Sequence, residues 1–315
     1  MLISIRQYTP SLNMDWSHVL KTSKNGLFLF DRRFIEYHGN RFDDLSSIAY
    51  IDDKPVAIFP AARTPNTNDI VSHPGLTFGG VILQRDLRGE IAFEVIDAFL
   101  HELRDRGASS LTVKLVPNFF SSYPSAEMEY ALWRRGFALS RRDLSSILPL
   151  NNPLQFNTLK RRGIARATKY GIQIKETSAS KFHAMLTEVL RTHHGVTPVH
   201  SVEDMELIIS RFPSEIDILG ACLDGNLLAG AMIFRYGHVW HTQYLACSES
   251  GRALGALDLV ISTVKEKATE AGAQYLSFGT STEQDGRVLN MGLLWQKESF
   301  GARSIVCDSM SGELK

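Results

Sequence analysis

The chain has 315 residues, of which 44% are hydrophobic and 22% are charged, and its formal net charge is zero. This composition is typical of a folded protein with a sizeable core, and it excludes a disordered or low-complexity chain. A zero net charge gives no global field towards nucleic acid or an acidic membrane. No apolar run approaches the roughly 20 residues that a helix needs to span a bilayer, so we expect no membrane span.

The beginning of the chain and its cysteines both indicate a cytoplasmic protein. Residues 1–8 carry neither a charged leader nor a long apolar stretch, so we expect no signal peptide. Cys222, Cys247 and Cys307 lie far apart in apolar contexts. An odd number of cysteines without paired spacing predicts reduced, buried thiols.

The first half of the chain contains three landmarks: a hairpin, a strand–helix–strand unit, and a short helix that leads into a strand. The hairpin has an acidic turn, and the long helix has apolar residues at the helical period and ends at Gly107. In chain order we expect strands at 47–51, 56–59 and 76–83, a helix at 90–106, a strand at 111–116, a short helix at 130–137 and a strand at 145–150.

The second half repeats these landmarks in the same order, after two helices of its own. Its hairpin has Asp224-Gly225 at the turn, a strong hairpin signal. We expect helices at 181–193 and 202–211, strands at 218–223, 227–234 and 239–246, a helix at 254–271, a strand at 275–278, a short helix at 292–301 and a strand at 303–307. Equivalent landmarks lie 165 positions apart at Gly107 and Gly272, and 162 apart at Trp133 and Trp295. Such nearly constant spacing indicates duplication of one unit.

The pattern predicts an α/β (α+β) protein of two tandem units. A hairpin followed by a strand–helix–strand crossover predicts a mixed, mainly antiparallel sheet flanked by helices. We expect an N-terminal unit at 1–150, a basic linker helix within 151–175 and a C-terminal unit at 176–315.

The order of elements resembles that of the GNAT (N-acetyltransferase) superfamily, and the duplication around a basic helix resembles the Fem-type peptidoglycan-bridge aminoacyltransferases. The resemblance covers nearly the whole chain. Its most specific pieces are the basic segment 159–171 and a strand ending in Phe278-Gly279, followed after a helix by Lys297-Glu298-Ser299-Phe300-Gly301. It implies an acyltransferase built from two tandem GNAT-like units.

The resemblance also implies a donor site at the start of the second long helix. GNAT enzymes typically bind the coenzyme A pyrophosphate through Arg/Gln-x-x-Gly-x-Gly/Ala, and helix N-termini suit phosphate. Segment 252–257 supplies the arginine and the first glycine, but Leu257 stands where the last small residue is expected. An ordinary glycine-containing turn is the alternative reading. The implied donor contacts are Gly251, Arg252, Gly255 and Ala256.

Three residues are candidates for the chemistry. Lys297 lies in line with an apolar helix stripe, so it should meet an anion: a substrate group, a developing oxyanion, or a structural carboxylate such as Glu283 or Asp285. His241 is a candidate base for the acceptor amine, or a packed histidine. Tyr244, expected on the opposite strand face from His241, is a core residue or a proton donor to the leaving group.

Charged and loop residues provide candidate anion contacts. Arg162, Arg166 and Lys169 share one face of the basic helix, which suits coenzyme A, a nucleotide-linked acceptor or the acceptor end of a tRNA, or else is a solvated face. His194 lies in a loop that could contact the acceptor. His238 and His241 are three apart on a strand and no Cys-x-x-Cys accompanies them, so we expect no metal site.

These observations predict an acyltransferase that moves an acyl group, with acyl-CoA as co-substrate and no permanently bound cofactor, to an amine or hydroxyl acceptor. The acceptor would be a small molecule, a glycan or a peptide, for example in cell-envelope or polysaccharide metabolism. The alternatives are a Fem-type aminoacyltransferase that uses aminoacyl-tRNA, and a non-catalytic GNAT-like binding module. The sequence does not indicate an oligomeric state.

Overall fold

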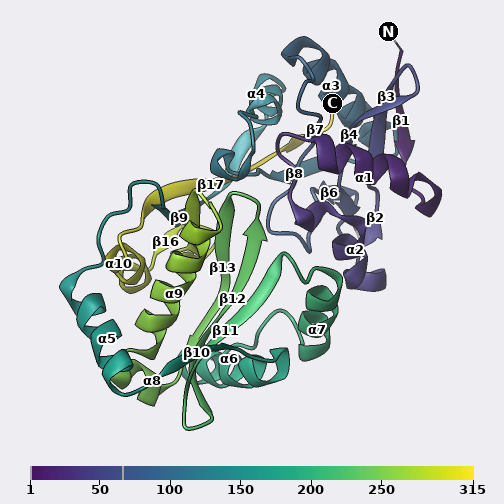
Figure 1. Ribbon diagram of the computed structural model, residues 1–315. Helices are drawn as coiled ribbons and strands as arrows, with labels where there is room; N and C mark the ends of the chain where they lie inside the picture. The colour runs from purple at the N-terminus through teal and green to yellow at the C-terminus, as the bar shows by residue number, and fades with distance from the viewer. Residues whose placement is uncertain (1, 66) are drawn as a thin grey trace. The chain divides into compact units, whose positions relative to one another are not determined.

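The computed structural model describes residues 2–65 and 67–315, apart from the side chains of Asn40, His193 and His194. The chain forms two compact units (Figure 1). Unit 1 consists of Met1–Asp143 together with Val306–Lys315, and unit 2 is Leu144–Ile305. The sequence predicted an N-terminal unit that ends at residue 150 and a C-terminal unit that begins at residue 176, and these boundaries differ from the limits of the two compact units. Whether the duplicated sequence itself ends at residues 150 and 176 stays a prediction.

Unit 1 contains a four-stranded antiparallel sheet in the order β1-β3-β4-β7 and a second group of strands in the order β17-β8-β6-β5-β2. Its strands are β1 (Ile3–Gln7), β2 (Asp43–Asp44), β3 (Ser47–Ile51), β4 (Lys54–Phe59), β5 (Ala62–Arg63), β6 (Asp69–Val71), β7 (Ile82–Leu83) and β8 (Ser110–Lys114). Its α-helices are α1 (Asn13–Thr22), α2 (Arg32–Ile35), α3 (Gly89–Asp105) and α4 (Glu127–Arg134). The predicted strand 76–83 is a strand only at β7, because Gly80, at φ 100°, interrupts the extended backbone.

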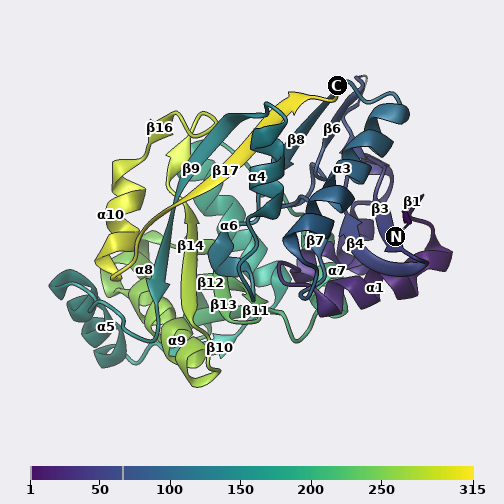
Figure 2. The ribbon, with the colours of Figure 1, turned by 90° about the horizontal axis from the view of Figure 1, so that it is seen from above.

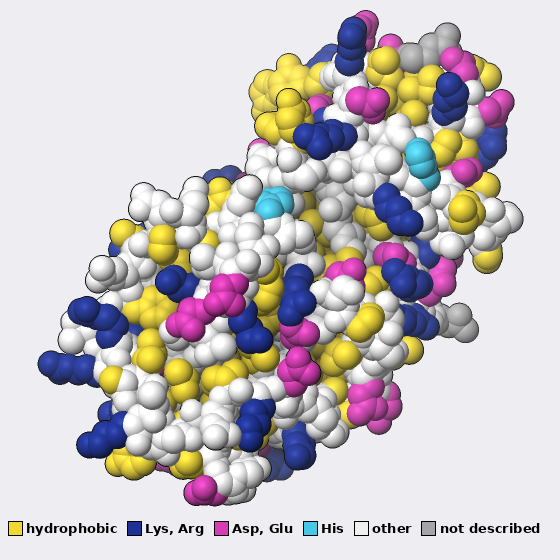
Figure 3. Space-filling view, in the orientation of Figure 1, with side chains coloured by type: hydrophobic (Ala, Val, Ile, Leu, Met, Phe, Trp, Pro, Cys, Tyr) yellow, Lys and Arg dark blue, Asp and Glu magenta, His cyan; other side chains and the backbone are white. Residues whose placement is uncertain are grey.

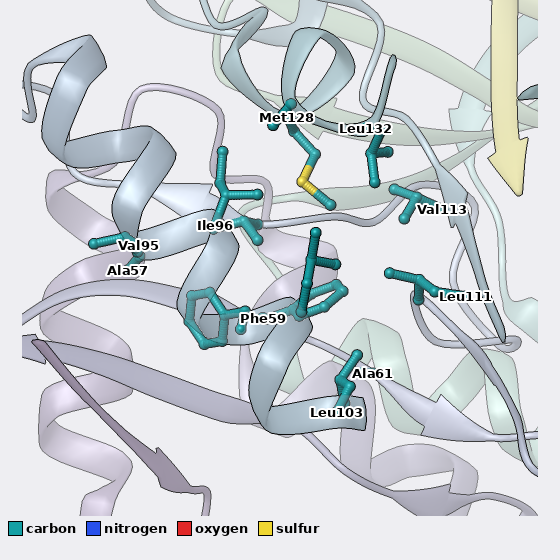
Figure 4. Close-up of a cluster of buried hydrophobic side chains, with 14 of the residues drawn as sticks. Ala57, Phe59, Ala61, Val95, Ile96, Leu103, Leu111, Val113, Met128 and Leu132 are labelled. Carbon is teal, nitrogen blue, oxygen red and sulfur yellow. The ribbon is translucent and has the colours of Figure 1, made fainter. Parts of the chain in front are cut away.

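The amphipathic helix α3 builds the core of unit 1 (Figure 4). Its apolar stripe, including Val95, Ile96 and Leu103, is buried against strand residues such as Phe59 and Val113. Burying each such side chain stabilises the fold by about 1.5–3 kcal/mol. The helical period seen in the sequence is therefore the period of the buried stripe.

Unit 2 contains one sheet in the order β10-β11-β12-β13-β14-β9. Its elements are α5 (Thr158–Lys169), β10 (Gln173–Glu176), α6 (Ala179–His194), α7 (Val202–Arg211), β11 (Ile216–Leu223), β12 (Asn226–Tyr236), β13 (Val239–Cys247), α8 (Glu249–Leu254), α9 (Ala256–Glu270), β14 (Tyr275–Thr280), β15 (Thr282–Glu283), β16 (Val288–Leu289) and α10 (Met291–Ser299). All strand pairs of this sheet are antiparallel except β13 with β14. The helix α9 packs on one face of the sheet, and α6 covers the other (Figure 2).

The two units repeat one order of elements along the chain, although the strands of unit 1 are divided between two sheets and β8 lies beside β6. The hairpin β3–β4 corresponds to β11–β12, α3 corresponds to α9, and β8 corresponds to β14. In each unit a closing strand then pairs antiparallel with β8 or β14. These closing strands are exchanged along the chain: the end of β9 (Ala138–Pro149) pairs with β14 in unit 2, and the end of β17 (Arg303–Glu313) pairs with β8 in unit 1.

Candidate active site

Unit 2 has a wedge where two parallel strands separate. The strands β13 and β14 pair through Val239–Tyr275, Trp240–Leu276 and His241–Ser277. Beyond His241, β13 continues to Cys247, whereas β14 has its last pair with β13 at Ser277, reaches Gly279 at φ 69° and ends at Thr280. No described strand pairs with that side of residues 242–247. The main-chain groups on this side of residues 242–247 therefore have no strand partner among the described residues.

A β-bulge in β13 changes which side chains face the wedge. His241 lies opposite Phe234 and Tyr244 lies opposite Met232, with a register shift between Met232 and Ile233. Phe234 and Met232 are two apart on β12, so they share a face, and their partners share it too. The expectation that Tyr244 and His241 lie on opposite faces was wrong. In a regular strand residues three apart point to opposite faces, but the extra residue of the bulge places both side chains on the same face.

His241 is a buried, neutral imidazole. Its side chain is 8% exposed, and its Nδ1 lies 3.0 Å from the Ser277 hydroxyl oxygen. Burial, and to a smaller extent the charge of Lys297, lowers the pKa of His241 from 6.5 to about 4. Its function as a base stays a prediction, and so low a pKa makes its ring a weak proton acceptor.

Lys297, on α10, is buried with its ammonium bonded to neutral oxygens. Its Nζ donates to the Gly279 carbonyl at 2.9 Å, to the Thr280 carbonyl, and to the Ser281 hydroxyl at 2.9 Å. The inward direction predicted for Lys297 is confirmed, since the residue is 4% exposed. Neither Glu283 nor Asp285 is among these three partners. Burial lowers the pKa of Lys297 from 10.5 to about 8.

Tyr244 has a partner that the sequence did not indicate. Its hydroxyl lies 2.7 Å from Nδ1 of His200, a residue of the loop between α6 and α7. The two residues are 44 positions apart, and their contact depends on the bulge in β13, so no local pattern in the sequence could reveal it.

The predicted donor loop forms a short helix, α8, before α9. The Ser248 hydroxyl accepts from the Gly251 amide at 3.0 Å and caps α8, which ends at Gly255 in a left-handed conformation, φ 77°. A Cβ atom on Gly251 would collide with the Leu228 carbonyl oxygen. Arg252 is exposed on α8, whereas Gly251, Gly255 and Ala256 are buried. Of the four predicted donor contacts, Arg252 is the accessible side chain.

The helix α5 covers the beginning of α9. A Cβ atom on Gly255 would collide with the Gly163 carbonyl oxygen, so the two backbones approach closely there. Lys160 of α5 also pairs with Asp258 in the first turn of α9, at 2.8 Å. A phosphate at this helix end would meet the Asp258 carboxylate and the backbone of α5.

The other cations of α5 face solvent. Arg162, Arg166 and Lys169 are exposed, and no carboxylate of the described residues forms an ion pair with them. Figure 3 shows Lys and Arg side chains grouped over the region of α5. The predicted shared face is thus an unpaired basic surface, whereas Lys160 is structural. His194 lies at the end of α6, and its side chain is outside the described part of the chain.

The corresponding wedge in unit 1 is filled by its own chain. The Asn25 side chain donates to the Val81 carbonyl at 2.9 Å and accepts from the Leu83 amide at 3.0 Å. The Lys24 amide bonds the Leu83 carbonyl, and the Lys24 ammonium pairs with Glu127 at 2.5 Å. The edge of β7 is therefore occupied, and the open wedge is a feature of unit 2.

No described helix is long and apolar enough to cross a bilayer. No group of three or more His, Cys, Asp or Glu side chains in the described ranges is placed to hold a metal ion.

Unit 2 has the mixed sheet, with parallel strands that separate, that the GNAT resemblance leads one to expect. Residues 158–285 match the family model of the acetyltransferase (GNAT) domain. This match lies within unit 2, and it confirms the resemblance predicted from the sequence. No curated protein matches the chain by sequence.

Solved structures resemble the whole chain. FemX has a TM-score of 0.70 at 12% identity, covering 98% of this chain and 96% of FemX. L-PGS from Bacillus licheniformis has a TM-score of 0.61 at 12% identity, covering 97% and 92%. A tandem GNAT protein from the clavulanic acid biosynthesis pathway has a TM-score of 0.54 at 10% identity, covering 100% and 99%. At such identities the likeness shows the fold, and it confirms the predicted two-unit architecture.

Proposed function

We propose that unit 2 transfers an acyl group from an activated donor to an amine or hydroxyl acceptor, and that acyl-CoA is the donor. The observation that carries this proposal is the edge of β13 beyond His241, with which no described strand pairs. Its free main-chain edge suits an extended ligand with amide groups, because such a ligand can pair with a strand edge as an added strand does. The long arm of acyl-CoA carries amides and ends in the thioester.

The wedge would bring the reactive carbonyl to the polar cluster at its closed end, which contains His241, Ser277 and Lys297. The Lys297 ammonium places a positive charge where negative charge develops on the carbonyl oxygen, although its three donors hold the turn after β14. Tyr244, on the same strand face, supplies a proton to the leaving group. Direct attack by the positioned acceptor then suffices, without a covalent enzyme intermediate.

A second donor, aminoacyl-tRNA, is favoured by the position of α5. This helix covers the end of α9 at which a coenzyme A pyrophosphate would be expected, and it exposes the unpaired cations Arg162, Arg166 and Lys169. Unpaired cations on one face attract a phosphate backbone. The likeness to FemX extends over 98% of this chain, which agrees with this second candidate. The acceptor, whether a small molecule, a glycan or a peptide, stays a proposal.

A thermal-shift experiment separates the donors. A ligand at 100 times its Kd stabilises the native state by about 2.7 kcal/mol. Acetyl-CoA should raise the melting temperature, and Arg252→Ala should reduce that rise without lowering the melting temperature of the free protein, because Arg252 is exposed.

The control is charged tRNA, tested with a variant in which Arg162 and Arg166 are both replaced by glutamate. A rise with charged tRNA alone, lost in this variant, would replace acyl-CoA by aminoacyl-tRNA. No rise with either ligand would contradict both enzymatic proposals and favour the non-catalytic binding module.

A further inference from the structure

We infer that His200 is a positioning residue that forms, with Tyr244, a proton-transfer pair serving the wedge of unit 2. The inference rests on the acyl transfer proposed above and adds the source of the proton. It starts from the direct hydrogen bond between a phenol and an imidazole, two groups that both accept and donate protons.

Tyr244 occupies the part of β13 that borders the wedge. It lies beyond the last residue pair with β14, and the bulge places its side chain on the His241 face. Tyr244 is half-buried, and burial raises its pKa above 10.0. Its phenol therefore holds its proton at neutral pH until a developing negative charge takes it.

The geometry between Tyr244 and His200 allows the proton to lie on either partner. Their O–N distance is 2.7 Å, and the ring centroids are 5.7 Å apart in an edge-to-face arrangement. In one arrangement the phenol donates to Nδ1. In the other, Nδ1–H donates to the phenol oxygen, and the phenolic hydrogen is free to bond a substrate atom.

A second histidine fixes the backbone of His200. The Nε2 atom of His183, on α6, lies 3.1 Å from the His200 carbonyl oxygen, which can only accept. His183 therefore carries its hydrogen on Nε2, and its Nδ1 accepts from the Thr187 hydroxyl at 3.3 Å. These bonds from α6 hold the loop in the position at which His200 meets Tyr244.

The other titratable groups near the pair do not replace it. Asp204 acts on Tyr244 by charge, but its carboxylate completes the capping box with Ser201 at the start of α7. His241 is buried, and its Nδ1 faces Ser277. Tyr244 and His200 are each only half-buried, so protons can reach them from solvent.

The proposed step balances as follows. The acceptor nitrogen attacks the carbonyl carbon, a C–N bond forms, and the bond from carbon to the leaving sulfur or oxygen breaks. The leaving atom takes the phenolic proton of Tyr244. The phenolate then takes the Nδ1 proton of His200 in its imidazolium form, which leaves a neutral imidazole with its hydrogen on Nε2. The proton released by the acceptor nitrogen restores His200 by way of solvent.

Two substitutions of His200 distinguish proton transfer from support of the loop. His200→Asn keeps a donor or acceptor near the position of Nδ1 but cannot carry a proton, whereas His200→Ala removes both. With acetyl-CoA and a mixture of amino acids as probes, we expect His200→Asn to lower kcat about 10²-fold, the lower end of general acid–base effects. The KM for acetyl-CoA should stay within about twofold of the wild-type value. The melting temperature should stay within about 2 °C of wild type, because the loop keeps its hydrogen bond.

The matched control is His101→Asn, at an exposed histidine of α3, which should change none of these three quantities. Wild-type kcat and an unchanged pH profile in His200→Asn would overturn the inference.

A second measurement decides the pairing without turnover. In protein with ¹⁵N-labelled histidine, the nitrogen signals of His200, assigned by their loss in His200→Asn, should titrate at a different pH in Tyr244→Phe. The control Tyr170→Phe, at an exposed position of the chain, should leave them unchanged. An unchanged titration in Tyr244→Phe would refute the shared proton, even if acetyl-CoA proves not to be the donor. Coupled titrations without acetyl-CoA turnover would instead contradict the proposed donor and leave the pair supported.

Discussion

Replacing Lys297 by methionine tests whether its buried ammonium holds the turn after β14. Methionine keeps most of the apolar stem and removes the charge. The change leaves the carbonyls of Gly279 and Thr280 and the hydroxyl of Ser281 without the donor they share. The free energy of unfolding should therefore fall.

The size of the loss follows from two opposing effects. A hydrogen bond to a charged group stabilises by about 1.5–3 kcal/mol, so three such bonds contribute roughly 4.5–9 kcal/mol. Burial of the ammonium opposes them, since a fall in the pKa of Lys297 from 10.5 to about 8 corresponds to about 3 kcal/mol. We expect a net loss of about 3 kcal/mol, because neighbouring water or side chains recover part of the difference.

Urea unfolding at pH 7 measures this loss, with the exposed Lys267→Met on α9 as the control. Turnover per folded molecule, measured on the same samples, shows whether the charge also acts on the reaction. An unfolding free energy equal to that of wild type would refute the structural role argued here. If turnover also fell 10²–10³-fold in that stable variant, Lys297 would serve the chemistry alone.

Three further predictions concern unit 2. Between pH 6.5 and about 4 the unfolded chain binds a proton that native His241 does not, so the stability of the wild-type protein should fall as pH falls through this window. In His241→Asn the fall measured by urea unfolding should be smaller by about 2–3 kcal/mol. Equal slopes in the two proteins would contradict the low pKa. Gly255→Ala should destabilise the protein by about 2–4 kcal/mol in the same assay, because its Cβ would meet the α5 backbone and its φ is 77°. The control Gly89→Ala, at a position with open space around it, should be nearly neutral. Equal effects of the two substitutions would argue against the close approach of α5 and α9. The charge of the α5 surface is reversed by Arg162→Glu, Arg166→Glu and Lys169→Glu together. This variant should bind a fluorescent tRNA more weakly and with a smaller salt dependence, while its stability stays within about 0.5 kcal/mol of wild type. Unchanged binding would leave this surface without a phosphate partner.

The regular elements could be predicted because their causes are local. The stripe of α3, including Val95 and Phe99, repeats at the helical period, and the structure buries it. The turn at Asp224-Gly225 has positive φ at both residues, as the favoured hairpin turns require. The order of landmarks in the two halves likewise agrees with the order of elements along the chain, whereas the division of the unit 1 strands between two sheets was not predicted.

The arrangement of the site depends on events that have no local pattern. One extra residue in β13 reverses the face of Tyr244, and a strand pattern of period two cannot contain that information. Lys297 points inward as expected, but Leu289 and Leu293, the apolar residues on which that expectation rested, are 40% and 37% exposed. Its acceptors come from a backbone turn whose carbonyls any sequence could provide. The helix α5 covers the beginning of α9 because the backbones of Gly163 and Gly255 approach closely, and these two residues are 92 positions apart in the sequence.

The exchange of closing strands makes unit 2 an insertion within unit 1. Residues 144–305 form a continuous segment, whereas unit 1 is assembled from segments on either side of it. During synthesis, unit 2 is complete while unit 1 still lacks the strand that pairs with β8, so the order of completion is the reverse of the order of the units along the chain. Cutting the gene after residue 150 would therefore separate neither unit. A fragment of residues 144–305, or a chain in which a short linker joins residue 143 to residue 306, follows the boundaries of the fold.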